Sequence, residues 1–375
     1  MKKQKTYNIN LFLVLFPIMI FAGKLIRWTI LKSVLVDMSI GNGMISKIIS
    51  GATQFVFLSE VGMADAAGNS AAIFSAINFF GLTTTVQFEI YISFIWNIIL
   101  IALLLKSKKH LSLPQFLFWM TSIAVLNIWD FCLAKEPLQM IFFLVMMLII
   151  CSKKLNEHAK FIGIIITLLL SVLTYRVYYI LIVAFLIIVG LICKKWLLKL
   201  KKIKAKHIIL LLIILAGSYF VMLNAIKVID MESFNELMRV RTRLGEASTQ
   251  MLNIFKSENL AIFSLDYLIM ILRMLFPVEL IPMGIKYWPY VFYQILISYF
   301  LIKAIISMKK QSKSTNLALY LYIAFLLASG TFEPDFGSWV RHEAAIIPVL
   351  LVMAGIIIPK EKKEISYEKE NNTSN

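Results

Sequence analysis

Long apolar runs separated by short polar segments divide the chain into candidate membrane-spanning helices. The pattern predicts ten spans, at 9–23, 89–105, 114–129, 138–151, 161–174, 177–193, 207–224, 288–304, 316–330 and 343–358. Several runs are shorter than the roughly 20 residues that a helix needs to cross a bilayer, so tilt or flanking residues must complete them. We therefore expect an all-α, polytopic integral membrane protein with about ten transmembrane helices.

Lysine clusters set the expected orientation of these spans. They lie at 106–109, 153–160, 194–206, 303–313 and 360–369, on one side of the ten spans. Because cytoplasmic loops carry an excess of Lys and Arg, we expect these clusters and both termini in the cytoplasm. No small-residue cleavage site follows the basic start, so the first span should be retained. The chain then forms one transmembrane domain over 1–358, followed by a charged, disordered cytoplasmic tail over 359–375.

Three segments on the other side are too long or too polar for simple turns, namely 24–88, 226–286 and 331–342. The first is apolar but broken by glycines, which suits interfacial helices or an extra hairpin. Within the second, residues 232–255 alternate as an amphipathic helix. The stretch 262–286 is apolar but contains charged residues and prolines, which predicts a re-entrant element at membrane depth.

Composition excludes several classes of function. The chain is 60% hydrophobic and 16% charged, with a mean hydropathy of +0.81, which no soluble domain of 375 residues resembles. The net charge of +17 follows the lysine bias of the loops and is not a nucleic-acid footprint. The three cysteines have no ligand spacing, and no dinucleotide, P-loop or zinc motif occurs, so we expect no cofactor and no metal. The same absence disfavours an ATP-driven pump.

The arginines are separated from the lysines along the chain. Seven of the 38 basic residues are arginine, and all seven fall in or beside the segments expected outside: Arg27, Arg176, Arg239, Arg241, Arg243, Arg273 and Arg341. The lysine ammonium is a strongly hydrated point charge, whereas the planar guanidinium of arginine can bind phosphate or carboxylate through two parallel hydrogen bonds. This distribution indicates that the outer face handles an anion.

The segment between the last two expected spans concentrates ionisable groups. Glu333, Asp335, His342 or Glu343 could act as a general base there, and Arg341 could bind an anion. The alternative is a hydrophilic loop with an ordinary cap at a helix start, where acidic residues are common.

The amphipathic segment and the re-entrant stretch carry four further arginines. Arg239 and Arg243 are candidates for anion binding, or they form surface pairs with nearby glutamates. Arg241 projects toward the apolar stripe and either snorkels to headgroups or enters a site. Arg273 needs an anionic partner in its apolar surroundings, and Asp266, two helical turns earlier, is the alternative to a substrate.

Arg176 lies among tyrosines in a very short outside turn. The tyrosines could belong to an interfacial aromatic belt, or they could stack on a sugar ring next to a phosphate that Arg176 binds. Secondary candidates are Asp130, Lys135 and Glu136 in another outside turn. Glu89, at the opening of the second span, completes the candidate set.

With these residues in place, the chain resembles the Wzy-type polymerases of bacterial polysaccharide repeat units. The resemblance covers the whole length and rests on the span number, the basic uncleaved start and the arginine-rich outside loops. Arg273 followed by Gly284 also matches a spacing found in some members. The resemblance implies transfer of a growing glycan from undecaprenyl pyrophosphate to a new lipid-linked repeat unit, without a metal, for capsule, exopolysaccharide or O-antigen.

The resemblance also implies a multi-pass protein of the bacterial cytoplasmic membrane, surrounded by membrane lipid, with a flippase and a chain-length regulator as partners and no nucleic acid. The arginines would bind the pyrophosphate, and a carboxylate or His342 would accept the proton of the acceptor hydroxyl.

Three other functions stay open at this level. An integral-membrane glycosyltransferase with a polyprenyl-phosphate sugar donor would use acids of the first outside loop, such as Asp37, Glu60, Asp65 or Glu89. A lipid-linked glycan flippase would also need basic residues, but the long polar loop at 226–262 argues against it. A solute transporter would be expected to show internal repeats, and none is evident.

Overall fold

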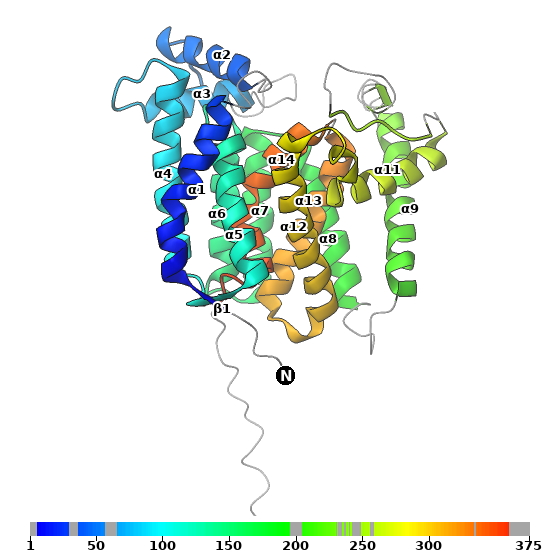
Figure 1. Cartoon of the computed structure of the whole chain (residues 1–375). Helices are drawn as coiled ribbons and strands as arrows, with labels where there is room; N and C mark the ends of the chain where they lie inside the picture. The colour runs from blue at the N-terminus through cyan, green and yellow to red at the C-terminus, as the bar shows by residue number, and fades with distance from the viewer. Residues whose placement is uncertain are drawn as a thin grey trace, which may run out of the picture.

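The structure is a computed structural model, and it describes residues 6–29, 37–56, 66–195, 205–229, 249–255, 259–333 and 335–359, together with 231, 235, 238, 239 and 241. Its described part is almost entirely helical (Figure 1). All but the first residue of the expected tail over 359–375 lies outside the described residues, and so does Arg243.

Helices make up most of the described residues. The longer ones are α1 (Ile9–Thr29), α2 (Asp37–Ile49), α3 (Ala66–Ala76), α4 (Thr85–Leu105), α5 (Leu113–Val125), α6 (Glu136–Cys151), α7 (Glu157–Thr174), α8 (Tyr179–Lys195), α9 (Ala205–Ile229), α11 (Leu260–Leu275), α12 (Trp288–Ser307), α13 (Lys313–Phe332), α14 (Phe336–Ala345) and α15 (Ile347–Met353). A π-helical turn, η1 (Leu126–Asp130), extends α5, and 3-10 turns η3 (Val278–Leu280), η4 (Ile285–Tyr287) and η5 (Met308–Lys310) flank α12. The strands β1 (Thr6–Asn8) and β2 (His110–Ser112) pair antiparallel and join the starts of α1 and α5.

Five helices of the described residues are long and apolar enough to cross a membrane: Ile9–Thr29, Thr85–Leu105, Glu157–Thr174, Ile285–Lys310 and Lys313–Phe332. The pair α14 and α15 becomes a sixth if the two are counted as one broken span, bent by 70°. Nine of the expected spans lie on helix over most of their length, whereas the last, 343–358, is interrupted between α14 and α15 and is not helical after Met353. The helix α6 and the apolar part of α8 are shorter than a full crossing. These helices are those of a multi-pass membrane protein.

Polar side chains define where the helices begin. The Asn156 side chain caps α7, and Ser312 caps α13 by accepting the backbone N–H of Thr315. Thr84 and Gln87 form a reciprocal capping box on α4. Such caps satisfy backbone N–H groups that have no partner within the helix.

Two expected boundaries differ from the helix ends. The expected outside segment that begins at residue 24 starts within α1, which continues to Thr29 and buries two charged residues with partners. Lys24 Nζ donates to the Phe131 carbonyl at 2.6 Å, and Arg27 pairs with Glu89 at 2.7 Å. The segment 331–342 is largely helical as well, since α13 ends at Phe332 and α14 begins at Phe336.

The central helix of the bundle is α13, which packs against α8, α15, α11 and α6. It runs through the middle of the view in Figure 1, with α1 and α4 on one side and α9 on the other. Gly330 permits a close crossing by α11, because a β-carbon there would lie 2.3 Å from Ile271 Cδ1. The bundle therefore has two ends, one at the lysine-bearing turns such as α12–α13 and one at the α7–α8 and α13–α14 turns.

Candidate functional site

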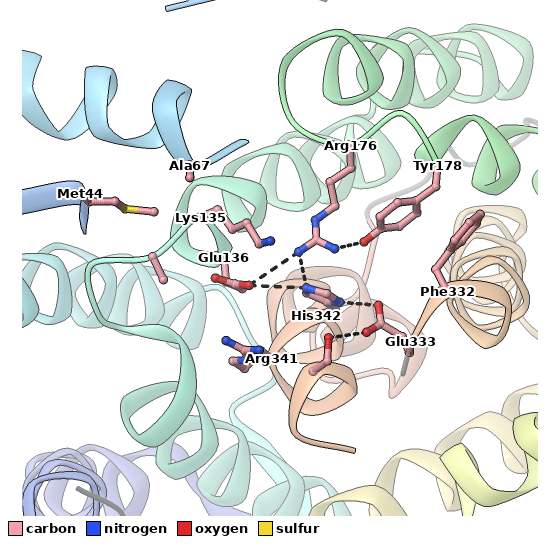
Figure 2. Close-up of a pocket in the computed structure, with 12 residues that line it drawn as sticks. Met44, Ala67, Lys135, Glu136, Arg176, Tyr178, Phe332, Glu333, Arg341 and His342 are labelled. Carbon is pink, nitrogen blue, oxygen red and sulfur yellow. Dashed lines mark hydrogen bonds and ion pairs between the residues drawn. The ribbon is translucent and has the colours of Figure 1, made fainter. Parts of the chain in front are cut away.

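A cavity of about 310 Å³ lies at the end of the bundle where α13 meets α14. The start of α6, the turn between α7 and α8, and the α13–α14 connection supply its polar wall (Figure 2). Its lining residues are Met44, Ala67, Ala134, Lys135, Glu136, Arg176, Tyr178, Phe332, Glu333, Ser338, Arg341 and His342. Six residues that the sequence singled out thus come together from three separate segments.

One polar face of the α14 helix is directed toward this cavity. Asp335 caps the helix by accepting the Ser338 backbone N–H at 2.8 Å, which fixes where the helix starts. Ser338 and His342 are four residues apart and therefore share one face. Glu333, which directly follows the last residue of α13, reaches this face and accepts a 2.6 Å hydrogen bond from Ser338 Oγ.

His342 is buried, at 5% exposure, and is held from both sides. Its Nδ1 atom contacts the Glu333 carboxylate, and its Nε2 atom contacts the Arg176 guanidinium (Figure 2). A guanidinium can only donate hydrogen bonds, so Nε2 is the acceptor of that contact. In the tautomer that fits both contacts, Nδ1 carries the proton and donates it to Glu333, and Nε2 is the acceptor on the side of the cavity.

A second carboxylate lies on the Arg176 side. Glu136, the first residue of α6, has its Oε1 atom 3.8 Å from Arg176 and 3.5 Å from His342 Nε2. It is 2% exposed. Tyr178 completes the contacts of Arg176, because its hydroxyl meets the guanidinium and its ring stacks on Phe332 with centroids 4.8 Å apart. Arg176 is thus held by groups from α6, α14 and its own turn.

The charges of the cavity favour an anionic ligand. Lys135, Arg176 and Arg341 supply three cations, and Glu136 and Glu333 supply two anions. Burial and the neighbouring Arg176 lower the pKa of the Lys135 ammonium below its ordinary value. A further negative group, supplied by a ligand, would offset that repulsion between cations.

The Glu333 carboxyl stays ionised over the physiological range. Burial raises its pKa, but His342 and Arg176 outweigh burial and hold the pKa at about 2. An ionised carboxylate on Nδ1 orients an imidazole and stabilises the imidazolium that forms when Nε2 takes a proton. Glu333 and His342 can therefore act as an oriented general base.

Two predicted acids of the same segment do not line this cavity. Asp335 is the cap of α14 and also forms a strand-like bridge with Gln250. Glu343 is fully buried behind the helix, where Tyr322 donates to it at 2.6 Å and Gln294 at 3.1 Å. The reason is helical geometry, since adjacent residues lie about 100° apart around a helix and His342 already faces the cavity.

The remaining arginines have other partners. Arg241 is buried and donates to the carbonyls of Glu333 at 2.5 Å and Gly330 at 2.6 Å, so it holds the end of α13. Arg273 pairs with Glu279 at 2.6 Å and does not pair with Asp266, its predicted alternative. Asp266 instead accepts backbone N–H groups of residues 254 and 255. Arg239 is exposed.

Two secondary candidates also lie away from the cavity. Glu89 faces α1, where Arg27 and Trp28 both donate to its carboxylate. Asp130 is fully buried in η1 and is not among the lining residues.

Sequence reasoning missed Ser338, and it left Tyr178 as either an interfacial aromatic or a residue that stacks on a sugar. Ser338 could have been found if the last helical segment had been started at its Asp335 cap and not at residue 343. The described residues contain no group of three or more His, Cys, Asp or Glu side chains placed to hold a metal ion.

No family model matches the chain, and no curated protein or solved structure matches it either.

Proposed function

We propose that this protein polymerises undecaprenyl-pyrophosphate-linked oligosaccharide repeat units at the outer face of the bacterial cytoplasmic membrane. The observation that carries the proposal is the buried Glu333–His342–Arg176 arrangement, with the basic Nε2 directed at a cavity that holds three cations. A general base beside a cationic pocket, at the end of apolar helices, suits a sugar transfer from a lipid diphosphate.

The cations would bind the leaving group. A pyrophosphate leaves as an anion, and fixed positive groups lower the barrier to its departure. The planar guanidinium groups of Arg176 and Arg341 would donate hydrogen bonds to the pyrophosphate oxygens, and Lys135 adds a third cation nearby. Met44, Ala67 and Phe332 form an apolar part of the same wall, next to which the polyprenyl chain would leave the site.

The base would act on the acceptor. The acceptor hydroxyl attacks the anomeric carbon of the donor glycan, the bond from that carbon to the pyrophosphate oxygen breaks, and the hydroxyl proton passes to His342 Nε2. Nε2 must first lose its contact with Arg176. Binding of the pyrophosphate competes for that guanidinium, so the base becomes available when the leaving group is in place. Glu333 then stabilises the imidazolium.

The membrane arrangement belongs to the same proposal. In this proposal, the ten expected spans cross or enter the membrane with both termini in the cytoplasm. The lysine-bearing turns would then lie inside and the cavity outside. A flippase would deliver the repeat units, and a chain-length regulator would act on the product.

The other two lipid-linked functions have less support. The acid Glu89, a candidate for a transferase with a polyprenyl-phosphate sugar donor, is engaged by Arg27 and lies away from the cavity. A flippase needs a passage for its lipid-linked cargo and has no use for an oriented base.

The proposal is tested in cells that lack the gene. They would be complemented with the wild type, His342→Ala, Arg176→Lys or the control Arg239→Lys, which changes an exposed arginine. We expect long surface polysaccharide with the wild type and the control, and single repeat units with the other two. Long chains from His342→Ala would refute the base, and loss of all surface glycan would indicate a flippase.

A further inference from the structure

A second cavity, of about 340 Å³, lies among α7, α8 and α13 at their other end. It is lined by residues near the start of α7 and α13 and near the end of α8. The two cavities lie toward opposite ends of α13, whose 20 residues are about 30 Å long at 1.5 Å per residue, close to the thickness of a hydrocarbon core. This cavity therefore lies at the lysine-rich boundary of the apolar bundle.

Its polar side is basic. Lys160 is 6% exposed, and its ammonium donates one hydrogen bond, of 2.7 Å, to Ser314 Oγ. An ammonium group carries three N–H donors, so Lys160 retains capacity for an anion. Lys313 stands at the rim, where Glu157 pairs with it at 2.9 Å and partly offsets its charge. The starts of α7 and α13 add two positive helix ends at the same place.

An independent observation indicates a ligand with a hydrogen-bond donor. Asn316 lines the cavity at 6% exposure, and its Nδ2 donates to the Met308 carbonyl. Its Oδ1 atom is buried, and no donor among the described residues reaches it. A buried acceptor without a donor is costly, which is why such groups usually have a partner.

The other side of the cavity is apolar and exposed. Phe161 and Leu317 form its floor, and Ile187 and Leu191 of α8 are 40% and 50% exposed. Gly190 leaves room between them, since a β-carbon there would meet only Phe161, at 3.8 Å. Exposed leucine and isoleucine on an apolar helix are the surface that lipid tails cover.

We propose that this cavity binds an anionic glycerophospholipid from the leaflet at the lysine-rich end. The phosphate contacts Lys160 and the rim lysine Lys313, a hydroxyl of the glycerol headgroup donates to Asn316 Oδ1, and an acyl chain lies along Ile187 and Leu191. The site uses no residue of the first cavity and does not depend on the function proposed for it.

The test uses the full chain in nanodiscs of mixed phosphatidylglycerol and phosphatidylcholine, with native mass spectrometry of the lipid retained after release. Lys160→Met keeps the length of the side chain and removes the charge, and Lys154→Met is the control, because Lys154 is an exposed lysine at the same end that does not line the cavity. We expect preferential retention of phosphatidylglycerol that falls about fivefold in Lys160→Met and is unchanged in Lys154→Met.

A second variant separates charge from shape. Gly190→Leu fills the apolar side without altering charge and should also abolish retention, which keeps the proposal testable if Lys160→Met fails to fold. Equal losses in both lysine variants would overturn the proposal in favour of diffuse attraction. Equal retention of phosphatidylcholine, or full displacement by inorganic phosphate, would overturn it as well.

Discussion

Replacing Glu333 by Gln removes a charge while keeping the shape and most of the hydrogen-bonding capacity of the side chain. The carboxyl pKa of about 2 lies well below the ordinary value of 4.5, and the difference corresponds to about 3 kcal/mol of preferential interaction with the ionised form. Because Glu333 is 2% exposed, solvent screens this interaction only slightly. Much of it comes from His342, which becomes fully cationic when it accepts a proton.

If that stabilisation is realised in the transition state, Glu333→Gln should lower kcat by about 100-fold. The KM for the lipid-linked repeat should change little, since Glu333 does not hold the leaving group in our proposal. The assay is the rate of chain elongation by the purified protein in vesicles that contain lipid-linked repeat units.

The neighbouring acid supplies a matched control. Asp335→Asn makes the same carboxylate-to-amide change two residues away, and Asn caps a helix about as well as Asp. It should keep kcat within about twofold. The reasoning is refuted if Asp335→Asn loses activity while Glu333→Gln retains it.

Three further predictions concern stability. The lowered pKa of Glu333 stabilises the fold above pH 4.5 and loses that effect as the pH falls toward 2, so the melting temperature of the wild type should drop more between pH 5 and pH 3 than that of Glu333→Gln. Arg241→Met should reduce the free energy of unfolding by about 2 kcal/mol and also lower kcat, because the Glu333 backbone loses its anchor; thermal unfolding and elongation assays that both match the wild type would contradict this. Gly330→Ala should cost about 1–3 kcal/mol by overpacking, and Ile271→Val, which removes the clashing methyl group, should restore part of the melting temperature; no rescue would show that the crossing is not the cause.

The helices were largely predictable because apolar runs bounded by lysines and caps mark spans directly. Nine of the ten expected runs lie on helix over most of their length. The helix ends differ from the expected ones where charged residues are buried with partners far along the chain. Lys24 and Arg27 read as the end of a span, but contacts with Phe131 and Glu89 keep them inside one. A sequence pattern carries no information about such partners.

The candidate site could likewise be predicted only in part. His342 and Glu333 lie nine residues apart in one segment, so their association could be anticipated. Arg176 meets His342 across 166 positions, which only the packing of α6 against α7 and α14 brings about. Conversely, Glu343 adjoins His342 in sequence yet points about 100° away from it around the helix, where Tyr322 and Gln294 donate to it. Which acid meets the cavity was decided by the start of α14 at its Asp335 cap.

Arg273 pairs with a nearby glutamate and not with Asp266, the partner within the chain that the sequence suggested. The sequence offered Asp266 as the alternative to a substrate anion, but the chain reverses after α11 and brings Glu279 to the guanidinium at 2.6 Å. Arg273 Nη1 also donates to the Leu252 carbonyl, so this arginine fastens the segment at 252 to α11. Arg273→Lys should therefore affect the packing of that segment more than the chemistry at His342.

The most direct test of the central claim is the fate of lipid-linked repeat units in sealed vesicles that contain either the wild type or His342→Ala. Our account predicts that the wild type lengthens the glycan and releases one undecaprenyl pyrophosphate for each bond formed, whereas His342→Ala does neither. Single repeat units that remain intact and cross the bilayer with the wild type, or equal lengthening by His342→Ala, would contradict it.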